Sequence, residues 1–317
     1  MIARIFFFLT AALMTWSTAG LAQVAAPSLR PGALNTVSFN PAVLQWRKSA
    51  VTIGKLEGTN EIFDAAGTKL REDSFDGPFY QGVGVGEYFS IGAEKFTLDG
   101  SSSDPAATYL SNYDQTQAAL AGNIGDVVAL GVGVDNTTLD FSNNRQQVNE
   151  ITIAGVSLRL GEVFYLGLAV GDEMERREFG VGVREATRSI TRMGAAYLWQ
   201  GDESAIRASI FSEERDALTF QLNPGVYNVR GEIEERSWSI GGIYSNILVE
   251  YIFRDITLRN ETNAFERSEE RRAFNLGWVP REGLAIVLRF EERDLADQPT
   301  GVTHDRSRRR ITVSWQF

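Results

Sequence analysis

The sequence predicts an all-β protein, a transmembrane antiparallel β-barrel, and three observations carry this prediction. In the last strand, apolar and polar side chains alternate, so an extended chain turns one face to lipid and the other to water. The same alternation returns in many segments upstream. After residue 22, no apolar run is long enough for a membrane-spanning helix. A chain of this kind that enters a membrane must cross it with strands.

The last strand ends on aromatic residues. Its apolar face consists of Ile311, Val313, Trp315 and Phe317. An ordinary amphipathic edge strand of a soluble protein could also end this way. An aromatic final residue with a second aromatic two positions earlier resembles the terminal strand of outer-membrane barrels, which the barrel-assembly machinery reads. We therefore expect Trp315 and Phe317 to be the assembly signal.

The first 22 residues have the composition of a secretory signal peptide. Arg4 precedes an apolar run from Ile5 to about Trp16, and small residues around Ala22 offer a cleavage site before Gln23. The apolar run is too short for a transmembrane helix, for which about 20 residues are needed. We expect residues 1–22 to be a cleaved signal peptide that exports the rest of the chain.

Composition narrows the class of protein further. There are 41 acidic and 31 basic residues, with the signs interspersed, and this distribution argues against a nucleic-acid partner. Cysteine is absent, so no disulfide stabilises the fold. The mean hydropathy of −0.16 is normal for barrels, whose lumen and loops are polar. Neither a metal nor a cofactor is expected.

Short turns and long polar connections alternate along the chain. Short turns are expected at 123–126, 161–162, 245–246 and 280–283. Long connections are expected at Ser142 to Gln147, Glu173 to Thr187, Gln221 to Gly231, Asn260 to Glu270 and Ala296 to Asp305. Short turns at one rim and long loops at the other are typical of bacterial outer-membrane barrels, with the short turns on the periplasmic side.

The strand count is fourteen if the first part of the barrel contains three strands. Ala50 to Leu56 is expected to form the first strand, and Phe79 to Val85 is expected to pair with Tyr88 to Leu98 through a Gly86-Glu87 turn. If Phe79 to Leu98 were a single strand or a loop, the count would be twelve. The number of strands must be even, because both termini of the chain must lie on the periplasmic side. The barrel domain is expected to span residues 49–317.

Several charged side chains alternate out of phase with the apolar set. A charge facing lipid at the membrane midplane costs about 2–4 kcal/mol, so these residues are expected to line the lumen. They are Arg159, Arg192, Arg207, Glu250, Arg254, Arg289 and Glu291.

Residues 23–48, between the signal peptide and the first strand, contain the triplet Asn40-Pro41-Ala42. Pro41 lacks a backbone donor and Asn40 can bond its own backbone, so this stretch favours a compact turn over a strand. Phe39, like Val43 and Leu44, is too apolar for a free tail and needs cover. The alternative is a turn that merely leads into the first strand.

This triplet, in this position, resembles the N-terminal hatch of the FadL-type outer-membrane fatty-acid and hydrocarbon transporters. Gly77-Pro78-Phe79-Tyr80 and the hairpin from Leu120 to Val134 are also similar to that family. The resemblance implies a fourteen-stranded barrel blocked by a hatch, with hydrophobic substrates that leave sideways into the membrane. Phe39, Asn40, Pro41 and Ala42 are the gating residues that it implies. The chain departs from the family in its shorter length and abbreviated hatch, and it lacks the long apolar loop helices.

The sequence thus predicts a channel for passive uptake of hydrophobic or amphipathic small molecules, with outer-membrane lipids, lipopolysaccharide and the assembly machinery as partners. A polar diffusion pore or a purely structural barrel is the alternative. A lipid hydrolase would have to use His304, the only histidine, with Ser307.

The run Arg308 to Arg310 is expected to split across two faces and pair with carboxylates near Glu291. The acidic pairs Glu213-Glu214 and Glu269-Glu270 are expected to be solvated.

Two further patterns point away from enzymatic and nucleotide-binding functions. The glycines between Gly82 and Gly86 superficially match a nucleotide-binding motif, but that motif requires a helix to follow, and alternating strand residues follow here. One histidine in a polar loop is a weak basis for catalysis. We therefore predict that the protein is not an enzyme.

Overall fold

The computed structural model describes residues 40–161, 163–178, 182–201, 204–223, 226–260, 265–281, 283–297 and 303–316. The expected signal peptide, the first part of the expected plug with Phe39, and the final Phe317 lie outside the described residues. The described ranges hold the barrel strands and the end of the expected plug, from Asn40 onward.

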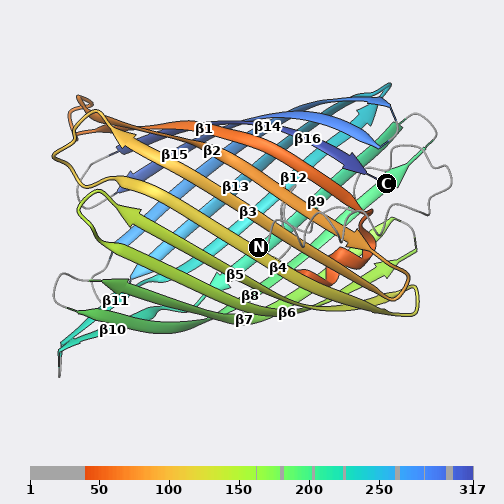
Figure 1. Ribbon diagram of the computed structural model, residues 1–317, viewed down its shortest axis with the longest axis horizontal. Coiled ribbons are helices and arrows are strands. Elements are labelled where there is room, and N and C mark those ends of the chain that lie inside the picture. The colour runs from red at the N-terminus through yellow and green to blue at the C-terminus, as the bar shows by residue number, and fades with distance from the viewer. Residues whose placement is uncertain are drawn as a thin grey trace, which may run out of the picture.

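Fourteen antiparallel strands close into a barrel, which confirms the fold class and the larger of the two expected strand counts (Figure 1). The last strand pairs with the first, with Trp315 opposite Val51. The barrel strands are β1 (Ala50–Phe63), β2 (Lys69–Val85), β3 (Phe89–Ser102), β4 (Leu110–Ile124), β5 (Val128–Phe141), β6 (Gln146–Leu160), β7 (Phe164–Glu178), β8 (Val183–Gln200), β9 (Ser204–Arg215), β12 (Glu232–Tyr244), β13 (Ile247–Asn260), β14 (Phe265–Arg281), β15 (Leu284–Asp297) and β16 (Thr303–Gln316).

Two smaller elements lie at opposite ends of the barrel (Figure 1). A 3-10 helix, η1 (Pro41–Trp46), precedes β1 and lies at the rim with the short turns. A separate hairpin of β10 (Leu218–Asn223) and β11 (Val226–Arg230) extends from the other rim, between β9 and β12. The two ends of the barrel are therefore built differently.

The short turns are where the sequence predicts them. Ser245 and Asn246 both have positive φ, 44° and 73°, which is the backbone of a two-residue hairpin turn that matches the twist of its strands. Gly125, in the turn between β4 and β5, has a φ of 66°, a conformation that glycine adopts without strain.

The outer ends of several strands are longer than predicted, and two of the five expected long loops, Glu173 to Thr187 and Gln221 to Gly231, are largely strand. The range from Glu173 to Thr187 is mainly strand, since β7 continues to Glu178 and β8 starts at Val183. Likewise, β1 continues past Leu56 to Phe63, and residues 221–231 lie largely in the β10–β11 hairpin. The reason is that these strand ends are polar on both faces, so apolar alternation stops before the hydrogen-bonded ladder does. Charged side chains that pair across neighbouring strands, such as Lys69 and Glu61, 2.7 Å apart, cover these strand ends.

The apolar side chains near the short-turn rim point outward. On β7, Leu166, Leu168 and Val170 are between 39% and 51% exposed, whereas Tyr165 and Ala169 between them are buried. A soluble protein has the opposite arrangement, with apolar residues inside. An outward apolar belt on a closed barrel is the arrangement of a membrane-spanning barrel, with lipid covering the belt. Within the described ranges, no helix has the length and apolar character to cross a membrane.

Candidate functional site

Helix η1 begins at the Asn-Pro-Ala triplet for local chemical reasons. The Oδ1 atom of Asn40 accepts a hydrogen bond from the backbone N–H of Ala42, at 3.2 Å, and caps the first turn. Pro41 occupies the first helical position, where its missing N–H costs nothing. At the other end, the N–H of Arg47 donates to the carbonyl of Leu44. The triplet is therefore the start of a short 3-10 helix.

The helix packs against two parts of the inner wall at once. Val43 contacts one buried apolar cluster and Leu44, which is 1% exposed, contacts another. The first cluster is on β7 and β8 and the second is on β2 and β4, with the members Tyr165, Ala196 and Leu198, and Val83, Ala119 and Ala121. Full burial of a valine or leucine side chain is worth about 1.5–3 kcal/mol, so these contacts hold the helix against the barrel.

Two glycines allow the start of the helix and its capping residue to lie against the wall. A Cβ atom on Gly131 of β5 would lie 2.4 Å from the backbone nitrogen of Ala42. A Cβ atom on Gly155 of β6 would lie 2.3 Å from Oδ1 of Asn40. A larger residue at Gly131 would have to displace the helix backbone, whereas one at Gly155 would have to displace the side chain of Asn40 that caps the helix. The wall therefore has two notches that fit η1.

Hydrogen bonds from the capping residue Asn40 and from two η1 residues complete the docking. Asn40 Nδ2 donates to the carbonyl of Val156 at 3.3 Å, and Trp46 Nε1 donates to Oγ of Ser157 at 3.1 Å. Gln45 donates to the carbonyl of Gly86 at 3.0 Å and accepts from Oγ of a buried serine, Ser90, at 2.9 Å. These bonds satisfy polar groups that burial would otherwise leave unpaired.

A partly buried cation, Arg47, follows the helix. Burial lowers the pKa of Arg47 to about 10, and the nearby Glu94 carboxylate acts in the opposite direction. The guanidinium therefore keeps its charge at neutral pH. Arg47 thus places a positive charge close enough to interact with Glu94 of β3.

Farther from η1, a chain of ion pairs covers the inner faces of β7, β8 and β9. Glu173 accepts from Arg188 at 2.7 Å and from Arg215 at 2.9 Å. Arg215 also donates to Glu213 at 2.6 Å, and Glu213 accepts from Arg192 at 2.5 Å. Both carboxylates are about 1% exposed. Each buried charge in this chain therefore has an opposite partner.

The residues predicted to line the lumen belong to more than one cluster. Arg192 is in the chain of ion pairs just described. Arg207 pairs with Glu250, which also accepts from Asn275 at 2.7 Å. Arg159, on β6, is partly buried. The remaining three, Arg254, Arg289 and Glu291, line one cavity together.

The expectation that the two acidic pairs are solvated is wrong for one member of each. Glu213 is buried between arginines, and Glu269 is buried where it accepts from Arg271 and Arg293. Their neighbours, Glu214 and Glu270, are exposed. Adjacent residues of a strand point to opposite faces, so an acidic pair necessarily puts one carboxylate inside.

The cavity in the lumen has a volume of about 300 Å³ and an arginine-rich wall. Glu94 of β3 and Glu291 of β15 supply carboxylates, and Arg289 donates to Glu291 at 2.6 Å. The arginines that line the cavity are Arg254, Arg271, Arg289, Arg308 and Arg310. Two of these belong to the run at 308–310, which splits across two faces as predicted, with Arg309 exposed on the outside.

Sequence reasoning missed Glu94, Arg271, Tyr113 and Gln117 as cavity residues. Glu94 and Gln117 are in phase with buried neighbours of their strands, so the period-two pattern contains the signal. The pattern does not tell which strands face each other across the lumen. That information comes from barrel closure.

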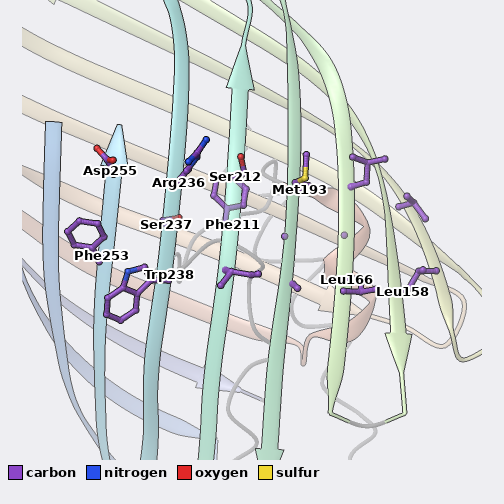
Figure 2. A pocket seen from close by; sticks show the side chains of 16 residues that line it. Leu158, Leu166, Met193, Phe211, Ser212, Arg236, Ser237, Trp238, Phe253 and Asp255 are labelled. Carbon is purple, nitrogen blue, oxygen red and sulfur yellow. The ribbon is translucent and has the colours of Figure 1, made fainter. Parts of the chain in front are cut away.

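A larger hollow lies on the outer wall. Its volume is about 850 Å³, and Figure 2 shows its labelled side chains spread over strands from β6 to β13. Leu168, Met193 and Trp238 are among the exposed apolar residues that line it, with Arg236 and Asp255 also at its edge. The ladders between β8, β9 and β12 continue beneath it. The hollow is thus a groove on the lipid-facing side and not a passage through the wall.

The ladder between β2 and β3 is interrupted at the Gly77-Pro78 dipeptide. Pairing stops at Asp76 opposite Asp99 and resumes at Phe79 opposite Phe96. Pro78 has no N–H to donate, and a Cβ on Gly77 would lie 1.9 Å from the carbonyl oxygen of Thr97. The motif was expected at the entry of the second strand but lies in the middle of β2.

The residues of the hydrolase alternative are not brought together. Ser307 is exposed on the outer face of β16 and shares a hydrogen bond with Thr59. His304 has the opposite parity on the same strand, so its side chain points to the other face. A serine and histidine on opposite faces of one strand do not form a nucleophile and its base.

Comparison with known proteins identifies similar folds but no close relative. No protein-family model matches the chain, and no curated protein matches its sequence. Among solved structures, a deletion variant of the monoaromatic hydrocarbon channel TodX has a TM-score of 0.60 at 10% identity, over 89% of this chain and 94% of that one.

Two further structures agree. A FadL homologue from Pseudomonas aeruginosa has a TM-score of 0.57 at 12% identity, over 95% of this chain and 98% of that one. The toluene transporter TodX from Pseudomonas putida has a TM-score of 0.55 at 10% identity, over 92% and 95%. The resemblance seen in the sequence is therefore confirmed for the fold: this chain has the barrel fold of the FadL-type channels.

Proposed function

We propose that the protein is an outer-membrane channel for passive uptake of hydrophobic or amphipathic small molecules, and that residues 23–48 act as its plug. The docking of η1 in the notches at Gly131 and Gly155 is the observation that carries the proposal. Glycines at these two positions have a clear purpose if the barrel must hold a removable segment against its inner wall.

The fold supports the same class of cargo. Similar structures are described as a monoaromatic hydrocarbon channel, a toluene transporter and a FadL homologue. Identity near 10% transfers the architecture and leaves the substrate open. The charged interior of this barrel suits an amphipathic molecule better than a fully apolar one.

In this mechanism, the plug moves while the barrel stays intact. Helix η1 is held by side-chain hydrogen bonds and two small apolar contacts, and it takes no part in the barrel ladder. The barrel strands, in contrast, are joined by continuous backbone pairing over most of their length. Release of the helix therefore costs far less than the opening of the wall.

We place the exit for hydrophobic cargo at the interrupted ladder between β2 and β3. Phe79 and Phe96 flank this interruption, with ring centroids 6.4 Å apart, and Phe96 also lines the lumen cavity. A molecule in the cavity is thus separated from lipid by two aromatic rings where two residues of each strand lack ladder partners.

The proposed membrane partners follow from the same arrangement of the barrel. Residues 1–22 direct export, and Trp315 with Phe317 serves the assembly machinery. Outer-membrane lipids cover the apolar belt and fill the outer groove with acyl chains, and lipopolysaccharide contacts the strand ends outside. Trp315 is 37% exposed on the outer face, where such recognition is possible.

Deletion of residues 23–46 tests the plug. The deletion variant, reconstituted in a planar bilayer, should conduct several-fold better than the intact protein, because the contacts of η1 with both walls are removed. The intact protein in the same bilayer is the reference. Equal conductance of the two forms would contradict the plug.

A pair of introduced cysteines tests the exit. Because the native chain has no cysteine, no other disulfide can form within it. In Pro78→Cys/Thr97→Cys, oxidation should stop the transfer of a hydrophobic dye into the liposome membrane, and reduction should restore it. The control is Ala118→Cys/Val134→Cys, across the intact ladder between β4 and β5. Transfer that oxidation leaves unchanged in the first pair would rule out this exit.

The ion-paired interior favours a second candidate, a general polar diffusion pore. Such a pore would let proteoliposomes swell in neutral sugars at a rate that hydrophobic compounds do not alter. The uptake channel predicts slow swelling that increases when residues 23–46 are deleted. The swelling rates distinguish the two functions with one preparation.

A further inference from the structure

The lumen cavity carries an excess of positive charge. Five arginines and two carboxylates line it. Arg271 pairs with Glu269, and Arg289 pairs with Glu291. Arg308 lies opposite Glu291 in the register of β15 and β16, but within the described chain its Nε atom is buried without a hydrogen-bond partner. A buried guanidinium donor of this kind favours an anionic acceptor.

One side of the same cavity is lined by aromatic rings. Phe96 and Tyr113 meet there edge to face, with ring centroids 5.6 Å apart, and Leu56 lies beside them. A ligand that fits both sides must have an anionic end and a compact apolar body. The volume of about 300 Å³ is at the small end of ligand pockets, so an extended acyl chain does not fit inside.

We propose that this cavity is a binding site for a compact organic carboxylate with a flat apolar part, such as a small aromatic acid. The planar guanidinium groups match the planar carboxylate and can bind it with two parallel hydrogen bonds. The inference deepens the proposed uptake function, on which it rests, by naming its substrate class. A carboxylate substrate differs from the neutral hydrocarbons after which the similar structures are named.

The first test uses the unmodified protein in detergent at pH 7. Isothermal titration should detect binding of benzoate and at least tenfold weaker binding of benzamide, which has nearly the same shape without the charge. Inorganic phosphate should also bind at least tenfold more weakly, because it has no apolar face. Equal affinity for benzoate and benzamide, or for benzoate and phosphate, would overturn the proposal.

The second test uses three neighbours on β16. Arg308→Gln and Arg310→Gln should each weaken benzoate binding about ten- to hundredfold, the usual value of a hydrogen bond to a charged group. Arg309→Gln is the matched control, since Arg309 lies between them on the same strand and is exposed on the outer face. Benzoate affinity that is the same in all three variants and in the wild type would refute the site.

Binding and transport are measured separately, so the two proposals can fail independently. Benzoate binding without any flux through proteoliposomes would uphold the site and contradict the channel. Flux of hydrophobic compounds without preference for benzoate over benzamide would uphold the channel and contradict the site.

Discussion

The inner wall of this barrel uses two different means to fill its lumen. Near the short-turn rim, small and apolar residues such as Gly131, Gly155 and Ala121 form a surface whose shape fits η1. Farther along the axis, fully buried arginines and glutamates, of which Arg192 and Glu213 are examples, occupy the inner faces of the strands. In the proposed mechanism, complementary shape makes a removable contact in one region, whereas paired charge makes a permanent one in the other.

This difference has a physical basis. A helix docked by apolar contacts can leave, because water can replace it at a cost of a few kcal/mol. An arginine that leaves a buried carboxylate exposes two unpaired charges, and this costs more. The two regions therefore differ in how readily they open, and substitutions in each region measure that difference.

The largest expected effect comes from the charged region. Glu213→Ala removes the partner of both Arg192 and Arg215, so the free energy of unfolding should fall by about 3–5 kcal/mol. Urea unfolding of the barrel in lipid vesicles, followed by tryptophan fluorescence, measures this change.

The neighbouring residue supplies the control for this substitution. Glu214 is exposed on the outer side of the same strand, and Glu214→Ala should change the free energy of unfolding by no more than about 0.5 kcal/mol. If both variants lost the same stability, the buried ion pairs would not be what holds this region.

A smaller effect on stability, but a larger one on conductance, is expected in the apolar region. Gly131→Val places a side chain where the backbone of Ala42 now lies, so η1 must leave the wall. Conductance in a planar bilayer should rise toward that of the variant without residues 23–46, while the barrel stays folded.

Gly122→Val is the matched control on the adjacent strand. A Cβ on Gly122 meets its nearest neighbour, the carbonyl oxygen of Tyr88, at 3.4 Å, which is an ordinary contact. Its conductance should equal that of the wild type. Conductance that does not rise in Gly131→Val would mean that the helix does not obstruct the lumen.

Where polar and apolar residues alternate, the sequence alone predicts the inside and outside of a strand, because period two determines the face of Arg289 as surely as that of Leu288. It also predicts the turn at Ser245 and Asn246, which depends on local backbone preference. It does not predict where β7 or β8 ends, since hydrogen-bonded ladders continue after the apolar pattern has stopped.

Contacts across the lumen also cannot be predicted from a single sequence. Gly155 fits Asn40 although 115 positions separate them, and no local pattern links the two. In the same way, the run at 308–310 shows which arginines share a face, but barrel closure decides that Glu94 lies near them. Local period and turn chemistry are read from sequence, whereas partners across a closed sheet follow from its topology.

The smallest expected effect separates the two hydrogen bonds of Asn40. Asn40→Ala removes both the helix cap and the bond to the carbonyl of Val156, while Asn40→Ser keeps a capping oxygen and loses only the second bond. Loss of a cap costs about 1 kcal/mol, which is close to a fivefold change in an equilibrium. The fraction of time that the channel is open in single-channel recordings should therefore rise about fivefold in Asn40→Ala and distinctly less in Asn40→Ser. Equal rises in both variants would show that the bond to the wall, and not the cap, keeps η1 docked.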